Sequence, residues 1–370
     1  MSQIETPAAS FRLGIVGTAK NTGKTTTLVA LIKHAHATGV SPAITSIGYD
    51  GEAVDNLTLL PKPRLDVFPG LVVATAERCI EQASARFETL DSGDEATSLG
   101  TVMIVRTLSE GRVLLAGPNR TDALERLLLR LQNHSPLIMI DGALGRMVPM
   151  AAADALVFAT GAARIVHIPL LAEEMAATLE IFRMPSLDPG DFPDLHPETV
   201  TLSFEGAAAR HFPFASLLSL ADAASIISSL PECRWDLHIP GAVGPDILHD
   251  LSDRLSDAGK FCRIMVSSAP MLLAGARPIP LRDTIRVLHK KGVQVCCVRS
   301  IPVLAVTINP FYPHQHGRRG MFEPAWVEEP ALRAEFTRRL DIPVINVLRD
   351  SPGAVWDAIM PGKNFPAGRL

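Results

Sequence analysis

The chain has 370 residues, a net charge of −4, 47% hydrophobic residues and a mean hydropathy of +0.21. This length can bury a large core and predicts more than one structural unit. The absence of a basic block and an aromatic content of only 5% exclude a dedicated nucleic-acid surface.

Three further features concern the compartment. The five cysteines lack Cys-x-x-Cys spacing, which predicts reduced thiols in a core rather than disulfides or zinc ligands. The chain starts without the basic and apolar regions of a signal peptide. It also has no uncharged apolar run of about 18 residues, as a membrane span would need. We therefore expect a cytoplasmic protein with no membrane partner.

The most informative motif lies near the start of the chain. An apolar run, Leu13 to Val16, leads into Gly17-Thr18-Ala19-Lys20-Asn21-Thr22-Gly23-Lys24-Thr25-Thr26. A strand, a glycine-bearing turn and a helix that opens at Gly-Lys-Thr form the context of a phosphate-binding loop. We predict that Lys24 reaches the β- and γ-phosphates of ATP and that the Thr25 hydroxyl is a ligand of Mg²⁺.

This motif also resembles a known family. Gly17-Thr18, four residues and Gly23-Lys24-Thr25 are similar to the loop of dethiobiotin synthetase, which also has threonine in place of the first glycine. That enzyme belongs to the P-loop class, together with MinD-like ATPases. The resemblance implies an α/β fold with a doubly wound, mostly parallel sheet of the P-loop NTPase type. The signature lysine of the MinD-like proteins corresponds to Ala19, and Lys20 follows one residue later.

The next segments predict a helix from Lys24 to about Thr38 and a strand from Pro42 to Ile47. Three carboxylates follow that strand, Asp50, Glu52 and Asp55. We predict that Asp50 and Glu52 act on the metal and that Asp50 also has a catalytic role. A polar loop that caps the next segment is the alternative interpretation.

Farther along, a helix is predicted over Thr75 to Thr89 and an exposed acidic loop over Glu88 to Gly100. The run Leu137-Ile138-Met139-Ile140 then ends in Asp141. A buried strand that delivers one carboxylate is the form of a second nucleotide motif, so we predict a metal-binding and catalytic role for Asp141. Asp141 to Gly145 resembles the Glu-Gly-Ala-Gly-Gly loop of dethiobiotin synthetase, with aspartate replacing glutamate.

Pro185 to Pro197 is rich in proline, aspartate and glycine and marks a boundary. Strand and helix patterns alternate again beyond it, which predicts further parallel βαβ units. We expect a nucleotide-binding core over 1–195, an additional α/β unit over 196–298 and a C-terminal strand–helix segment over 299–370 that returns to the nucleotide site.

The strand Val303 to Ile308 ends in Asn309-Pro310. A terminal asparagine can offer a donor and an acceptor to a purine edge, and the resemblance to dethiobiotin synthetase implies adenine recognition there. A simple Asn-Pro turn is the alternative. We expect a surface loop where His314 and His316 precede Arg318-Arg319.

A second resemblance spans most of the chain. The sequence is similar to a family identified as a reactivating P-loop subunit for lysine 5,6-aminomutase, a coenzyme B12 enzyme. The residues that carry this resemblance are the stretch from Gly17 to Thr26 together with Thr45-Ser46-Ile47-Gly48, Asp50-Gly51-Glu52, Ile140-Asp141-Gly142-Ala143, Ala159-Thr160-Gly161-Ala162-Ala163 and Thr307-Ile308-Asn309-Pro310-Phe311. It implies ATP hydrolysis that helps to release damaged cofactor from a partner enzyme.

Three hypotheses follow. The first is an ATPase that acts on a partner enzyme, with a homodimer as one possible assembly. The second is a ligase or kinase similar to dethiobiotin synthetase, with a small carboxylic or amino acid as substrate. The third is a nucleotide-binding module without turnover. We rank them in this order.

Overall fold

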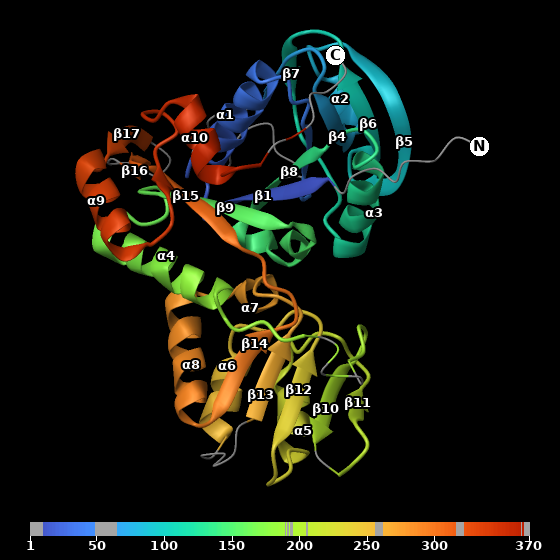
Figure 1. Ribbon diagram of the computed structural model, residues 1–370, viewed down its shortest axis with the longest axis vertical. Helices are drawn as coiled ribbons and strands as arrows, with labels where there is room; N and C mark the ends of the chain where they lie inside the picture. Colours follow the sequence, from blue (N-terminus) through green and yellow to red (C-terminus); the bar gives the residue numbers. More distant parts are fainter. Residues whose placement is uncertain are drawn as a thin grey trace. The chain divides into compact units, whose positions relative to one another are not determined.

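The computed structural model describes residues 10–48, 65–188, 190, 192, 195–204, 206–255, 262–315, 322–363 and 365. These residues form two compact units (Figure 1). The first unit contains the described residues of Met1–Leu171 and Val303–Leu370, and the second contains those of Ala172–Pro302. The chain therefore leaves the first unit, builds the second, and returns.

The first unit is built on a sheet that has nine strands among the described residues. Seven of these strands run parallel, and the last two, β6 and β5, pair antiparallel at one edge. In spatial order the strands are β18 (Val344–Ile345), β15 (Val303–Asn309), β9 (Ala155–Gly161), β1 (Phe11–Gly17), β8 (Leu137–Ala143), β2 (Ala43–Ser46), β4 (Val72–Ala76), β6 (Gly100–Thr107) and β5 (Phe87–Thr97).

The central strands are nearly continuous apolar runs because helices cover a parallel sheet on both faces. Every residue of β9 is buried, as are the first four residues of β8. The helices of this unit are α1 (Lys24–Ala37), α2 (Glu77–Glu81), α3 (Thr121–Leu131), α9 (Glu329–Arg339) and α10 (Pro352–Ile359), with short 3-10 turns at η1 (Leu144–Arg146) and η2 (Val148–Ala152). The predicted α/β class is thereby confirmed.

Helix α1 lies against the centre of this sheet. It buries Leu28, Leu31 and Ile32 in one cluster with Leu13 and Ile15 of β1. Each of these side chains is almost fully removed from water, which contributes roughly 1.5–3 kcal/mol per side chain to folding. Helix α10 packs beside α1. The packing fixes the start of α1 relative to the end of β1.

Two predictions between residues 75 and 100 are wrong. The helix predicted over 75–89 covers only α2, because Ser84 exchanges hydrogen bonds with Arg112 and carries the chain away as an extended segment. The exposed loop predicted over 88–100 is mostly β5, which pairs with β6. Its composition is polar because an edge strand faces water. Arg130 of α3 fixes it through ion pairs to Asp91 and Glu95.

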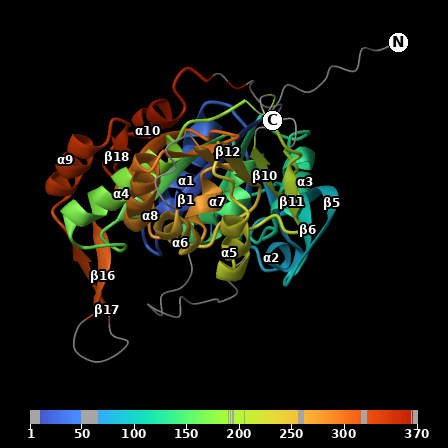
Figure 2. The same ribbon diagram turned by 90° about the horizontal axis from the view of Figure 1, so that it is seen from below.

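Two short antiparallel ribbons complete the first unit. β3 (Leu65–Val67) pairs with β7 (Gly111–Val113). β16 (Phe311–Gln315) pairs with β17 (Phe322–Trp326), and Figure 2 shows these two strands side by side. His314 therefore lies in a strand rather than in the predicted loop, because cross-strand hydrogen bonds order this segment. His316, Arg318 and Arg319 lie outside the described residues.

The second unit has its own five-stranded sheet among the described residues. Its last three strands are parallel, as the sequence predicted, and the first two form an antiparallel edge. The spatial order is β11 (Arg210–Phe212), β10 (Val200–Phe204), β12 (Trp235–Ile239), β13 (Cys262–Val266) and β14 (Val293–Cys297). The helices are α4 (Ile168–Phe182), which begins in the first unit, and α5 (Leu220–Ser228), α6 (Ile247–Arg254), α7 (Pro270–Leu273) and α8 (Pro278–Lys290).

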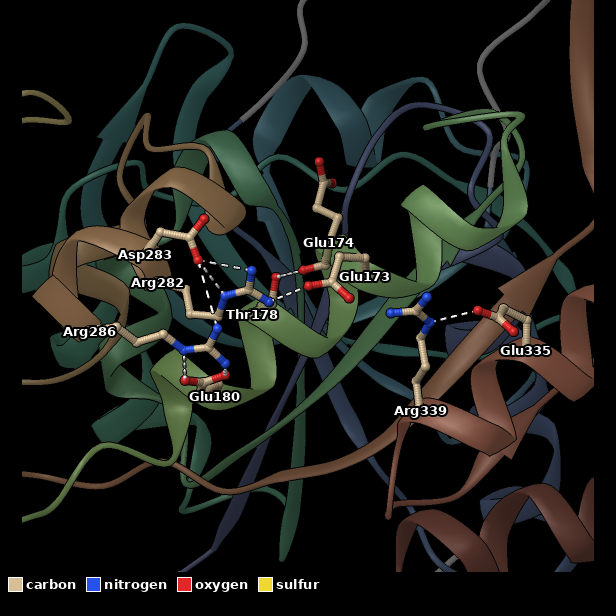
Figure 3. Close-up of polar contacts among 9 residues, drawn as sticks. All are labelled: Glu173, Glu174, Thr178, Glu180, Arg282, Asp283, Arg286, Glu335 and Arg339. Carbon is tan, nitrogen blue, oxygen red and sulfur yellow. Dashed lines mark hydrogen bonds and ion pairs between the residues drawn. The ribbon is translucent and has the colours of Figure 1, made fainter.

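Ion pairs join α4 to α8 within the second unit (Figure 3). Arg286 binds both carboxylate oxygens of Glu180, at 2.8 and 2.7 Å. Arg282, which is 9% exposed, binds Glu173 and the neighbouring Asp283. A buried guanidinium needs such partners because an unpaired buried charge is costly. We interpret this network as structural.

All five cysteines are free thiols, and four of them are buried. Burial raises the pKa of Cys296 to about 12 and that of Cys297 to about 11, so both stay protonated at neutral pH. No helix among the described residues is long and apolar enough to cross a membrane.

Candidate functional site

The candidate site lies where parallel strands of the first unit end together. The register places Gly17 of β1 beside Ala143 of β8 and Ala159 of β9, and it places Asn309 of β15 beside Gly161. The carboxyl ends of these strands therefore form one edge. In open α/β sheets, such an edge is where ligands bind.

The loop that follows β1, here called the Gly17–Thr26 loop, is anchored to β9 at its start. Thr18 donates its backbone N–H to the carbonyl of Ala159 at 3.0 Å. The Thr18 hydroxyl, which is buried, donates to Thr160 Oγ1 at 2.9 Å. The threonine that replaces the first glycine of the usual motif thus has a structural role here.

The middle of the loop turns through two left-handed residues. Asn21 has φ +62° and Gly23 has φ +90°, a conformation that glycine adopts without strain. The Thr22 hydroxyl donates to the carbonyl of Ala19 at 2.9 Å. Helix α1 begins at Lys24 without a side-chain cap and without an acidic residue in its first turn.

This geometry leaves a series of backbone donors open. Among the residues that the structure describes, no acceptor is found for the N–H groups of Asn21 through Thr26. They lie at the positive end of the α1 dipole. Consecutive open N–H groups at a helix start form an anion-binding arrangement, and phosphate is the anion that such arrangements bind best.

Two predicted residues, Lys24 and Asp141, are brought together at this loop. Lys24 Nζ lies 3.0 Å from Asp141 Oδ2, and their side chains are 26% and 18% exposed. The Lys24 stem passes over Gly17, where an added Cβ would lie 3.3 Å from Lys24 Cβ and Cδ. The lysine therefore folds back across the loop toward β8.

The oxygen donors at this site suit a hard cation. The Thr25 hydroxyl is half-buried and has no hydrogen-bond partner among the described residues, and Asp141 supplies a carboxylate. Mg²⁺ is commonly held by one or two such protein oxygens, with substrate phosphates and waters completing its shell. The described residues contain no cluster of three or more acidic, histidine or cysteine ligands.

The loop after β8 meets the chain that follows β2. Arg146 Nη1 donates to the carbonyl of Ile47 at 3.0 Å, and Gly48 N–H donates to the carbonyl of Pro118 at 3.0 Å. The chain that follows β8 and the chain that follows β2 therefore meet at this edge, as far as residue 48. Asp50, Glu52 and Asp55 lie outside the described residues, and the role predicted for them stays a prediction.

Asn309 lies directly against the Gly17–Thr26 loop. Its Nδ2 donates to the carbonyl of Asn21 at 2.8 Å, and its Oδ1 accepts from Phe311 N–H at 3.1 Å. The contact between Oδ1 and Phe311 N–H closes a turn around Pro310. Such an Asn-Pro turn was the alternative interpretation of this segment. Purine recognition by Asn309 stays a prediction.

Sequence reasoning missed two residues that support the site. Thr307 Oγ1 and Thr27 Oγ1 lie 2.9 Å apart, and this contact joins β15 to the first turn of α1. A polar residue in an otherwise apolar strand, two positions before Asn309, is the signal that could have identified Thr307, because alternate residues of a strand share one face.

The second unit contains a separate groove of about 520 Å³ between α6 and α8. Among its charged side chains, Asp283 pairs with Arg282, and Asp253 lies 3.6 Å from His249 Nε2.

The chain was compared with models of known protein families and with curated proteins, and neither comparison found a match.

Proposed function

We propose that this chain binds ATP with Mg²⁺ at the Gly17–Thr26 loop and hydrolyses it. The observation that carries the proposal is the run of N–H groups from Asn21 to Thr26 that find no acceptor in the described part of the chain, at the start of α1, where no side-chain cap is present. Polyphosphate oxygens are multivalent acceptors, so one phosphate chain can satisfy several of these donors at once. The Lys24 ammonium lies beside them and supplies the positive charge that a polyphosphate requires.

The Lys24–Asp141 pair has a defined place in this proposal. On nucleotide binding, Lys24 exchanges the Asp141 carboxylate for phosphate oxygens, and Asp141 becomes available to a Mg²⁺ ion that Thr25 also holds. The metal neutralises charge on the phosphates when it is bound. Because the ion pair is only partly exposed, breaking it without a new partner would be unfavourable, which favours simultaneous binding of metal and nucleotide.

We further propose that hydrolysis serves a partner protein, as in the reactivase family that the sequence resembles. The alternative is transfer to a small carboxylic or amino acid. A pocket for such a substrate would have to form beside Gly48, where the chain continues into residues that the structure does not describe. The described residues at this edge do not distinguish a partner protein from a small acid substrate. The partner-protein interpretation rests on the sequence resemblance alone, so the experiment must separate these two alternatives.

The test measures ATP binding and phosphate release by the full chain, with Mg²⁺ and with EDTA, first alone and then with a library of carboxylic and amino acids. We expect Mg²⁺-dependent ATP binding and slow release that no metabolite accelerates. If one acid accelerates phosphate release, the protein is a ligase or kinase rather than an ATPase that acts on a partner protein. If ATP does not bind, the nucleotide site itself is rejected.

Asp141→Asn sharpens this test because it keeps the side-chain shape and removes the negative charge. ATP affinity should remain within about tenfold, whereas Mg²⁺-dependent phosphate release should fall by a factor of about 1,000. Asp122→Asn is the matched control, since Asp122 lies at the start of α3 and pairs only with arginines on the surface. Unchanged phosphate release by Asp141→Asn would show that another residue supplies the carboxylate ligand of the metal.

A further inference from the structure

Strand β15 holds the Gly17–Thr26 loop through two side chains on one face. Asn309 Nδ2 donates to the Asn21 carbonyl at 2.8 Å, and Thr307 shares a hydrogen bond of 2.9 Å with Thr27. The two residues are two positions apart, so their side chains point to the same side of the strand. One contact lies before the Gly23-Lys24 step and the other lies after it.

The contact to Asn21 sets the direction of one peptide plane. The carbonyl of Asn21 is turned toward Asn309, and in a trans peptide the following N–H, that of Thr22, points the opposite way. This N–H is one of the donors that find no acceptor among the described residues. The orientation of a proposed phosphate donor is therefore determined by a side chain that lies outside the loop.

Asn21 also needs external support for its conformation. Its φ of +62° is left-handed, and it is the non-glycine residue with positive φ among those that the structure describes. Such a residue costs free energy and persists when its surroundings hold it. The Asn309 amide is the side-chain group that bonds to the Asn21 peptide.

Asn309 is held through both its side chain and its backbone. The side-chain Oδ1 accepts from Phe311 N–H, because Pro310 has no N–H to offer, and the backbone carbonyl of Asn309 accepts from Ala162 N–H at 2.9 Å. With Oδ1 committed to Phe311, Nδ2 is directed toward Asn21. The side chain therefore holds the loop from a rigid position between β9 and β16.

We propose that Asn309 is a positioning residue for phosphate binding, which holds the Asn21–Thr22 peptide so that the loop donors are organised before the ligand arrives. Thr307 supports the same geometry from the other side of Gly23-Lys24. The inference rests on the proposed function. It assigns Asn309 to the phosphate chain, whereas the family resemblance implies a contact with the adenine base.

A ligand without a base separates these roles. Calorimetry would measure the affinity of Mg²⁺–ATP, Mg²⁺–GTP and Mg²⁺–tripolyphosphate for the full chain and for three variants: Asn309→Ala, Thr307→Val and Ile308→Val. We expect Asn309→Ala to weaken all three ligands by the same factor, about tenfold, as the loss of one organising hydrogen bond predicts. Thr307→Val should weaken them about threefold. Ile308→Val, on the other face of β15, should leave all three affinities unchanged.

Three results would overturn the inference, and they are distinguishable. A changed ATP-to-GTP ratio with unchanged tripolyphosphate affinity would assign Asn309 to the base. A lower unfolding temperature in Asn309→Ala with unchanged affinities would make its role structural only, and the proposed function would stand. Failure of the unmutated chain to bind ATP and tripolyphosphate would reject the proposed function, and the inference with it. Thr307→Val preserves shape and keeps the test informative if Asn309→Ala folds poorly.

Discussion

Both units contain a strand that leads through a glycine-bearing loop into a helix. The two loops differ in whether their backbone N–H groups are bonded within the protein. In the first unit, β1 leads through the Gly17–Thr26 loop into α1. In the second, β12 leads through a loop at residues 240–246 into α6, here called the 240–246 loop. Both loops contain two glycines and follow a mostly buried strand. β1 is parallel to both of its neighbours, whereas β12 is parallel to β13 and antiparallel to β10. By chain topology alone, either could receive a phosphate.

The 240–246 loop has already used its donors within the protein. Four consecutive N–H groups, those of Gly241, Ala242, Val243 and Gly244, bond to the Ala215 carbonyl, Ser216 Oγ, the Met271 carbonyl and the Leu217 carbonyl at 2.8–3.1 Å. In addition, Asp246 directly precedes α6, and Asp250 lies in the first turn of that helix. Acidic residues complement the helix dipole and repel an anion.

The comparison teaches that an anion site depends on what the rest of the fold leaves open. The Gly17–Thr26 loop keeps its N–H groups from Asn21 to Thr26 without acceptors among the described residues, and a lysine accompanies them. The 240–246 loop has neither feature. A glycine-bearing turn before a helix is therefore not sufficient for this kind of site.

The largest test of the comparison is Lys24→Ala. This variant removes the ammonium group that pairs with Asp141 at the loop, and on the proposed function it should weaken ATP binding by about 100-fold or more. Lys33→Ala is the matched control, because Lys33 is an exposed lysine on the same helix and should leave affinity unchanged. Equilibrium binding of a fluorescent ATP analogue would measure both. If Lys24→Ala binds ATP with normal affinity, Lys24 does not distinguish the Gly17–Thr26 loop from the 240–246 loop as a phosphate site.

A second prediction concerns the pH dependence of the second unit. His238 of β12 is 5% exposed, and burial lowers its pKa to about 4 from an ordinary value of 6.5. The unfolded chain therefore takes up a proton more readily than the folded unit. The stability from neutral His238 is fully present above pH about 6.5 and is lost as the pH falls toward 4, by an amount on the order of 2 kcal/mol.

Urea unfolding, followed through the fluorescence of the buried Trp235, would measure this loss. His238→Gln cannot take up the proton, so its stability should change less between pH 7.5 and pH 4.5. Equal slopes in the two proteins would show that other groups dominate the acid sensitivity of this unit.

The smallest expected effect comes from Gly241→Ala. A Cβ at this position would overlap Ser216 Oγ, because the 240–246 loop passes directly against that side chain. We expect a loss of stability of about 1–2 kcal/mol, seen in urea unfolding, and no change in ATP affinity. A drop in ATP affinity without a loss of stability would mean that this loop also binds nucleotide.

The sequence predicted the parts of the fold that depend on local pattern. Apolar runs identified the central parallel strands, and helical spacing identified α1. It did not identify β5, whose polar residues are held by pairing with β6 and by Arg130 of α3. β5 and β16 are each held by pairing with another strand, β6 and β17, and the residue pattern of a single polar strand does not record that pairing.

The candidate site shows the same division. By itself, the sequence determined that a glycine–threonine turn with Lys24 starts a helix and that Asp141 ends an apolar run, because both patterns are local. Only the tertiary structure decided that Lys24 contacts Asp141, that the N–H groups of Asn21 to Thr26 find no acceptor among the described residues and that Asn309 holds the Asn21 peptide. Asn309 lies 288 residues along the chain from Asn21, and only the parallel sheet brings them together.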